Sequence, residues 1–110
     1  MAVHEFGIMP SVPGPERYDA YEPHRYGCVE VPDDLLETVL PQLDGLECFW
    51  HTTLCPGRNL AYCGVTLIPP QSLPTFLRVL RASGKSGFAP LICLLEQAAQ
   101  QQCYLIHFGL

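Results

Sequence analysis

The stretch from Leu46 to Ile68, LECFWHTTLCPGRNLAYCGVTLI, decides the fold class of this chain. It contains two apolar runs, 46–54 and 60–68, separated by the turn-forming segment CPGRN. Two such runs joined by a short loop with proline and glycine predict an antiparallel β-hairpin. Three of the six cysteines and the only tryptophan also lie in this stretch, so it bears on chemistry as well as on fold.

The pairing expected for this hairpin places large apolar side chains on both faces of the sheet. If CPGRN is the whole loop, Trp50 lies opposite Gly64 and His51 lies opposite Cys63. Phe49 shares the face of His51, and neither face is free of large hydrophobes. An antiparallel sheet with helices on one side usually exposes its other side to water. We therefore expect a cover on the second face, which is the N-terminal arm, a second subunit or a ligand.

The remaining elements give the order strand, helix, strand, strand, helix, strand. Residues 26–31 and 103–108 predict the outer strands, and a helix beginning at Asp33 should kink or end at Pro41. The second helix is expected in two pieces around 73–83 and 89–102. This βαββαβ order is that of the ferredoxin-like split βαβ fold. We predict an α+β protein whose antiparallel sheet has its helices on one face.

The chain is predicted to be a single domain over residues 1–110, with an α+β core at 26–110. Residues 1–25 precede the core as an extra strand near 3–9 and a proline- and tyrosine-rich arm. Three tyrosines, Tyr18, Tyr21 and Tyr26, indicate that the arm docks on the protein. They either anchor the arm by burying their rings or form a surface on which a ligand stacks.

Charge and composition exclude several classes of function. The formal net charge is −5, with −8 in residues 1–47 and +3 in residues 48–110. An acidic chain without a basic stripe is unsuited to nucleic acid, because phosphate contacts dominate that affinity. No segment has the apolar length of a membrane span or the layout of a signal peptide, so we expect a cytoplasmic protein that does not bind membranes.

The six cysteines are expected to be reduced, because cytosolic thiols rarely form disulfides. Most should be packed as small hydrophobes, Cys63, Cys93 and Cys103 among them. Their spacing matches no zinc ribbon or finger, and the four histidines are scattered singly. We therefore expect no metal site and no cofactor.

Two groups of residues are candidates for chemistry. A thiol beside an imidazole, Cys63 with His51, is the pattern of a nucleophilic cysteine, although both side chains can equally be packed in mid-strand. Cys55 lies three residues from Arg58, whose guanidinium suits anion recognition, although a solvated turn explains the pair as well. For binding we expect Arg58, His51, Phe49 and the three arm tyrosines.

No catalytic signature is present, and the leading interpretation is therefore a binding or regulatory module without enzymatic activity. It is expected to form a homodimer through the sheet face and to enclose a small ligand there. The alternative is a small thiol-dependent enzyme that uses Cys63 or Cys55 with His51 or Arg58. A third possibility is that the acidic N-terminal half binds a basic protein partner.

Overall fold

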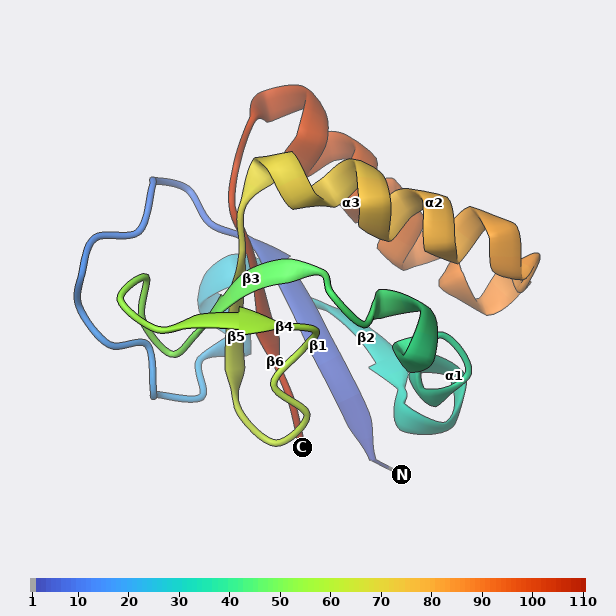
Figure 1. Ribbon diagram of the computed structural model, residues 1–110, viewed down its shortest axis with the longest axis horizontal. Coiled ribbons are helices and arrows are strands. Elements are labelled where there is room, and N and C mark those ends of the chain that lie inside the picture. The colour runs from blue at the N-terminus through green and yellow to red at the C-terminus, as the bar shows by residue number, and fades with distance from the viewer. Residues whose placement is uncertain (1) are drawn as a thin grey trace.

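The computed structural model describes residues 2–110 and has an α+β architecture built on one antiparallel sheet (Figure 1). The strands are β1 (Val3–Ile8), β2 (Val29–Pro32), β3 (Glu47–Trp50), β4 (Pro56–Arg58), β5 (Val65–Ile68) and β6 (Leu105–Phe108). The α-helices are α1 (Asp33–Glu37), α2 (Leu73–Ser83) and α3 (Ala89–Gln101). The predicted α+β class and antiparallel sheet are confirmed. None of the helices in residues 2–110 has the length and apolar character needed to cross a bilayer.

The strand order is β2-β1-β6-β5-β3-β4, and every neighbouring pair is antiparallel. The ferredoxin-like order is not confirmed, because the sheet has six strands and β6 lies between β1 and β5. The helices explain the difference. One crossover helix would make the flanking strands parallel. Here α2 and α3 run out and back as a pair, so β6 begins beside the end of β5, with Ile68 opposite Leu105.

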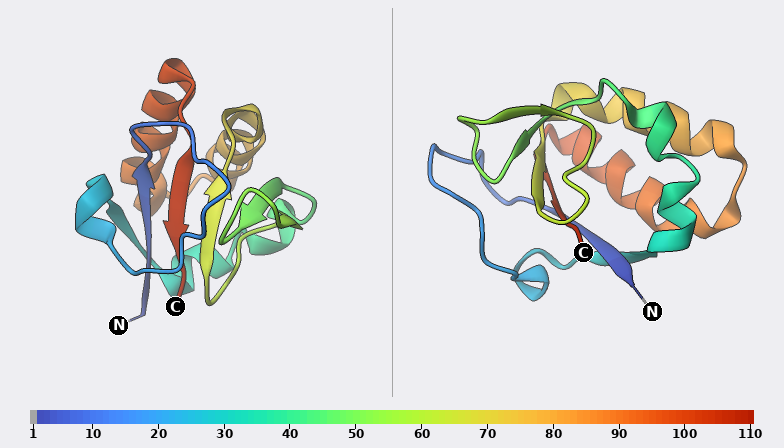
Figure 2. Two further views of the ribbon diagram at one scale, coloured as in Figure 1. Left: turned by 90° about the vertical axis from the view of Figure 1, so that its left-hand side faces the viewer. Right: turned by 60° about the horizontal axis from the view of Figure 1, so that its bottom comes forward.

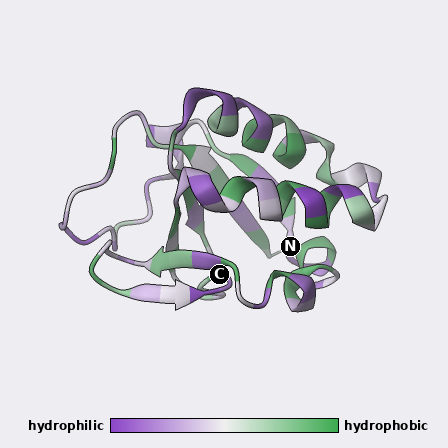
Figure 3. Ribbon diagram, turned by 45° about the horizontal axis from the view of Figure 1, so that its top comes forward, coloured by the Kyte–Doolittle hydropathy of each residue, from purple (hydrophilic) through white to green (hydrophobic). Residues whose placement is uncertain are grey.

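Helices α2 and α3 cover one face of the sheet, as the sequence predicts (Figure 3). Their buried side chains recur every three or four residues, which forms one apolar stripe on each helix. These side chains are Leu73, Phe76, Leu77 and Leu80 on α2, and Leu91, Leu95 and Ala98 on α3. Helix α2 ends where predicted, at Gly84, whose φ of 67° is a left-handed conformation that favours glycine.

The opposite face of the sheet is covered by the N-terminal arm, which supplies one of the three expected covers. Figure 2 shows the arm crossing in front of the strands, on the side away from α2 and α3. Tyr18 and Tyr26 pack against an apolar cluster formed by Met9, Val65, Leu67, Ile106 and Phe108. The approach is close: a Cβ at Gly7 would lie 2.6 Å from the Cβ of Tyr26.

The predicted register of the central hairpin is wrong. Phe49 lies opposite Leu67, and Trp50 lies opposite Thr66. The expected loop CPGRN contains a strand of its own, β4, which pairs with the outer edge of β3. His51 and Cys63 are therefore not cross-strand neighbours.

The reason for this altered register is the packing of Trp50. Its indole lies over Gly57 of β4, where a Cβ would come within 2.3 Å of the ring. The indole Nε1–H also donates to the carbonyl of Asn59, at 3.0 Å. Pro56 is tolerated because β4 is an edge strand, where one side of the backbone needs no partner. The glycine that allows the close approach is thus Gly57 and not the predicted Gly64.

All six cysteines are free, which agrees with the prediction of reduced thiols. The expectation that most are buried is wrong: only Cys48 is buried, and Cys55, Cys63 and Cys93 are exposed. Cys63 precedes β5 and lies in a turn. Cys93 falls outside the buried stripe of α3.

Candidate functional site

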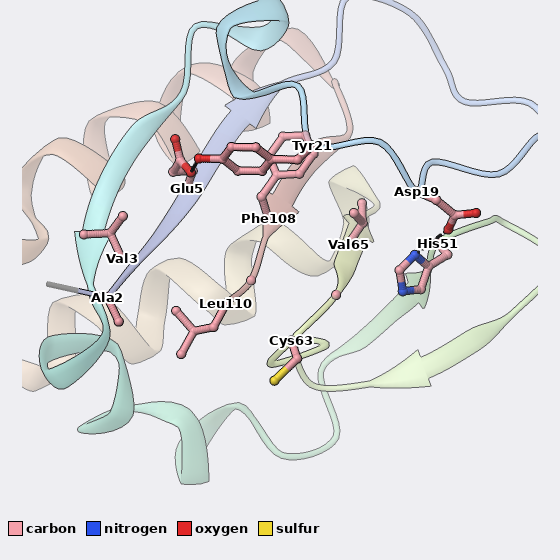
Figure 4. Close-up of a pocket in the computed structure, with 12 residues that line it drawn as sticks. Ala2, Val3, Glu5, Asp19, Tyr21, His51, Cys63, Val65, Phe108 and Leu110 are labelled. Atoms are coloured by element: carbon pink, nitrogen blue, oxygen red, sulfur yellow. Dashed lines mark hydrogen bonds and ion pairs between the residues drawn. The ribbon is translucent and has the colours of Figure 1, made fainter.

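A cavity of about 560 Å³ lies on the arm-covered face, between the arm, the sheet and the turn that precedes β5 (Figure 4). Its wall includes Glu5 of β1, Val65 of β5 and Phe108 of β6. These three residues share one face because Phe108 lies opposite Glu5 in one ladder and opposite Val65 in the next. The register of three central strands therefore builds the wall on which the arm and the loop residues converge.

The arm contributes Tyr21, which joins the aromatic and acidic parts of the wall. Its ring meets that of Phe108 edge to face, with centroids 5.7 Å apart and an interplanar angle of 83°. Its hydroxyl donates a hydrogen bond to the carboxylate of Glu5. This hydrogen bond is the main cause of the raised pKa of Tyr21. Figure 4 shows the Tyr21 ring lying over Phe108 and reaching toward Glu5.

His51 lies at the other side of the cavity and ties the arm to β5. Its backbone is left-handed, with φ at 65°, and its N–H donates to the carbonyl of Val65 at 2.9 Å. The ring lies over Gly64, where a Cβ would be 2.6 Å from Nε2. The carbonyl of His51 accepts the backbone N–H of Tyr18 at 2.6 Å. These contacts fix the position of the imidazole on the cavity wall.

Asp19 of the arm faces the His51 ring. Oδ1 of Asp19 lies 2.7 Å from Nδ1 of His51, in a close contact that lacks the geometry of a hydrogen bond. Its other oxygen accepts a hydrogen bond from Nε of Arg17 at 2.8 Å. The pKa of Asp19 is lowered, chiefly by this bond to Arg17 and further by the nearby His51. Asp19 therefore presents a carboxylate at the rim of the cavity.

The predicted site residues fall into three places. His51, Cys63 and Tyr21 line the cavity together, although Cys63 reaches it from a turn and not across a strand pair. Tyr18, Tyr26 and Phe49 pack against the apolar cluster on the arm-covered face, which we call the arm-face cluster and which consists of Met9, Val65, Leu67, Ile106 and Phe108. Cys55 and Arg58 do not line the cavity: Cys55 is exposed, and Arg58 lies on β4 opposite Glu47.

A chain of polar groups, all buried except the partly exposed Asp33, crosses the sheet on its helix-covered face. Oδ1 of Asp33 lies 2.8 Å from Nε2 of His4, and Nδ1 of His4 lies 2.9 Å from Nε2 of His107. Nδ1 of His107 lies 3.1 Å from Oγ1 of Thr66, which accepts the N–H of Ala61 at 2.8 Å. The two histidines and Thr66 are fully buried. We call Asp33, His4, His107 and Thr66 the buried relay.

The buried relay is satisfied with both imidazoles neutral. In that assignment Thr66 donates to His107, His107 donates to His4, and His4 donates to the Asp33 carboxylate. Burial, and to a smaller extent the neighbouring His4, lowers the pKa of His107 to about 3. The hydrogen bond from His4 is the main cause of the lowered pKa of Asp33, and the hydroxyl of Tyr62 adds to it. The relay thus stabilises neutral His107 beside an ionised Asp33.

The sequence interpretation missed Glu5, Asp19 and the buried relay. His4 and His107 are separated by 103 positions, so only the pairing of β1 with β6 brings them together. A usable signal was present: each is a polar residue within a short apolar strand, VHEFGI and LIHF.

Comparison with known proteins does not assign this site. No family model, no curated protein and no solved structure gives a significant match to the chain. Within residues 2–110, no three His, Cys, Asp or Glu side chains are grouped so as to hold a metal ion. The functional argument therefore depends on the geometry of the cavity and of the residues around it.

Proposed function

We propose that this chain is a small, non-enzymatic binding module whose ligand occupies the cavity between the arm and the sheet. The observation that carries the proposal is the cavity itself, at about 560 Å³, since pockets for small molecules generally measure about 300 to 1,000 Å³. Its wall is largely apolar, with Val65 and Phe108, and a few polar groups converge on it. That combination suits a ligand held by apolar contact and oriented by hydrogen bonds or charge.

Cys63 offers a direct test, because it lines the cavity and is exposed. A mixture of small-molecule fragments is screened by ligand-observed NMR before and after N-ethylmaleimide modifies Cys63 in a Cys55→Ser/Cys93→Ser variant. The matched control is Cys55→Ser/Cys63→Ser, in which the reagent modifies the exposed Cys93 of α3 instead. We expect the Cys63 adduct to abolish fragment binding and the Cys93 adduct to leave it intact. Binding that survives the Cys63 adduct would contradict the proposal.

A thiol-dependent enzyme is the second candidate, and one observation favours it: an exposed Cys63 shares the cavity with His51. An activated thiol reacts fast because the thiolate is the nucleophile. Mild iodoacetamide treatment at pH 7 compares Cys63 with Cys93 and Cys55, which are also exposed. Labelling of Cys63 at least about tenfold faster than the other two would support this candidate, and similar slow rates would contradict it.

Homodimer formation through the sheet face stays a prediction, and the cytoplasm stays the expected location. The dimer was predicted from an apolar face in need of a cover, and the arm packs on that face. A strict monomer in sedimentation at micromolar concentration would contradict the dimer and leave the binding proposal intact.

A further inference from the structure

We infer that the ligand of the arm-face cavity is a small organic cation, such as an alkylammonium or quaternary ammonium compound. The inference rests on the proposed function and adds the chemical class of the ligand. Its starting point is Glu5, a carboxylate that is only 8% exposed and yet lies on the cavity wall. Buried carboxylates are usually paired with a cation or held by several hydrogen bonds.

Glu5 has neither kind of compensation within residues 2–110. Its side chain receives one hydrogen bond, from the hydroxyl of Tyr21. No Lys, Arg or His of those residues forms an ion pair with it. An ionised carboxylate offers about four acceptor positions, so a single protein donor leaves the others to water or to a ligand in the cavity. A cationic group in the cavity would supply the missing charge and the missing donors.

The strand register gives a second reason for a cation beside Glu5. Glu5 lies directly opposite Glu30 in the β1–β2 ladder, and like charges in that position repel each other. A cation beside Glu5 reduces this repulsion as well. An anionic ligand would increase it, and a neutral ligand would leave it unchanged.

The rest of the wall also suits an organic cation. The Tyr21 and Phe108 rings meet edge to face beside Glu5, and aromatic faces attract ammonium groups. Figure 4 shows Asp19 at the opposite end of the drawn cavity from Glu5, with Phe108 and Val65 between them, but its carboxylate is already paired with Arg17 and contacts His51, so Glu5 alone carries the charge argument. One acidic end beside an apolar and aromatic wall matches a ligand that carries positive charge on a hydrocarbon skeleton.

The test uses three probes of nearly the same shape and different charge: choline, its neutral carbon analogue 3,3-dimethylbutan-1-ol, and the anion 3,3-dimethylbutanoate. Each is titrated into the full chain, and the shifts of the Val65 methyl signals are followed by NMR. We expect choline to bind at least tenfold more tightly than the neutral probe, with no detectable binding of the anion. Glu5→Gln should reduce choline affinity to that of the neutral probe. Glu30→Gln removes the same charge across the ladder, outside the cavity lining, and should keep the preference for choline.

A salt titration keeps the test decisive if Glu5→Gln does not fold. Raising NaCl from 50 to 300 mM should weaken the binding of choline by several-fold and leave the neutral probe unaffected. Equal affinities for choline and the neutral probe would overturn the cation inference and leave a binding cavity in place. If no probe shifts Val65 while screened fragments bind in the cavity, the inference likewise fails and the proposed function stands. If nothing binds there at all, both fail.

Discussion

The two faces of the sheet are both apolar, but different kinds of structure close them. Helices α2 and α3 cover one face and satisfy their own backbone hydrogen bonds, so their apolar stripes can be pressed fully onto the strands. The arm covers the other face as an irregular chain with one 3-10 turn at Pro23–Tyr26, and it is held by a few hydrogen bonds to loops and strand ends. The helix face carries the larger buried core, whereas the cavity of about 560 Å³ lies under the arm.

The polar residues on the two faces differ in the same way. On the helix face the buried relay pairs its groups in one continuous chain from Asp33 to Thr66. On the arm face, Glu5 is buried with a single donor. A fully paired polar network stabilises and orders a core, whereas an under-satisfied group on a cavity wall is available to a ligand. We therefore assign stability to the helix face and propose binding on the arm face.

The largest expected effect compares two isoleucines in central strands. Ile68 of β5 is buried in the helix-face core, and Ile106 of β6 is buried in the arm-face cluster. Ile68→Ala should lower the free energy of unfolding by about 4 kcal/mol, because the helices cannot close the space that it leaves. Ile106→Ala should cost about 2 kcal/mol, because the arm can settle into the gap. Urea denaturation of both variants measures the difference, and equal losses would show that the two faces are equally rigid.

The second prediction tests the buried relay. His107→Phe keeps an aromatic ring but leaves His4 without its buried partner, so the free energy of unfolding should fall by about 2 kcal/mol at pH 7.5. The wild type should also be acid-sensitive in a defined window. The unfolded chain binds a proton at His107 below pH 6.5, the usual value, while the folded chain does not until about pH 3. The contribution of His107 to the free energy of unfolding is therefore complete above pH 6.5. Below pH 6.5 it decreases by up to about 1.4 kcal/mol for each pH unit.

Urea titrations at pH 7.5, 6.5, 5.5 and 4.5 measure that slope. In His107→Phe, the decrease in the free energy of unfolding between pH 6.5 and 4.5 that is due to His107 should be absent. The control is His24→Gln, which removes an exposed histidine of the arm and should keep the wild-type slope. An unchanged slope in His107→Phe would mean that the relay is not the acid-sensitive element.

The sequence predicted those parts of the fold that local periodicity determines. The stripe of α2 and its end at Gly84 follow from spacing and from glycine conformation, so they were predictable. The strand order was not predictable. It depends on whether α2 and α3 together form a single crossover, which would make β5 and β6 parallel, or an antiparallel pair, which makes them antiparallel. The register of β3 was not predictable either, since an unforeseen contact between Trp50 and Gly57 turns the expected loop into β4.

The candidate site was predictable only in part, for the same physical reason. His51 and Cys63 were identified through a hairpin register that is wrong, although both residues line the cavity. Glu5 and Phe108 come from opposite ends of the chain, and only the pairing of β1 with β6 places them side by side. Long-range strand pairing is the information that a single sequence lacks.

The smallest predicted effect compares how often each face opens. Cys28 packs at the arm face and Cys48 in the helix-face core, and burial raises the pKa of both thiols to about 11. The pKa of both thiols is raised by the same cause, so a large difference in labelling rate reports access. In a variant with serine at the other four cysteine positions, iodoacetamide at pH 8.5 should label Cys28 on the order of tenfold faster than Cys48.

The two sites are separated by cleavage at glutamate and quantified by mass spectrometry. Urea below the unfolding transition should raise the Cys28 rate first, because the arm can detach while the helices stay packed. Labelling of Cys48 should require global unfolding, since its thiol also donates to the carbonyl of Asn59 at 2.8 Å. If both rates rise together at every urea concentration, the arm is part of the same cooperative unit as the helices. A ligand could then reach the cavity only through its existing opening and not by displacement of the arm.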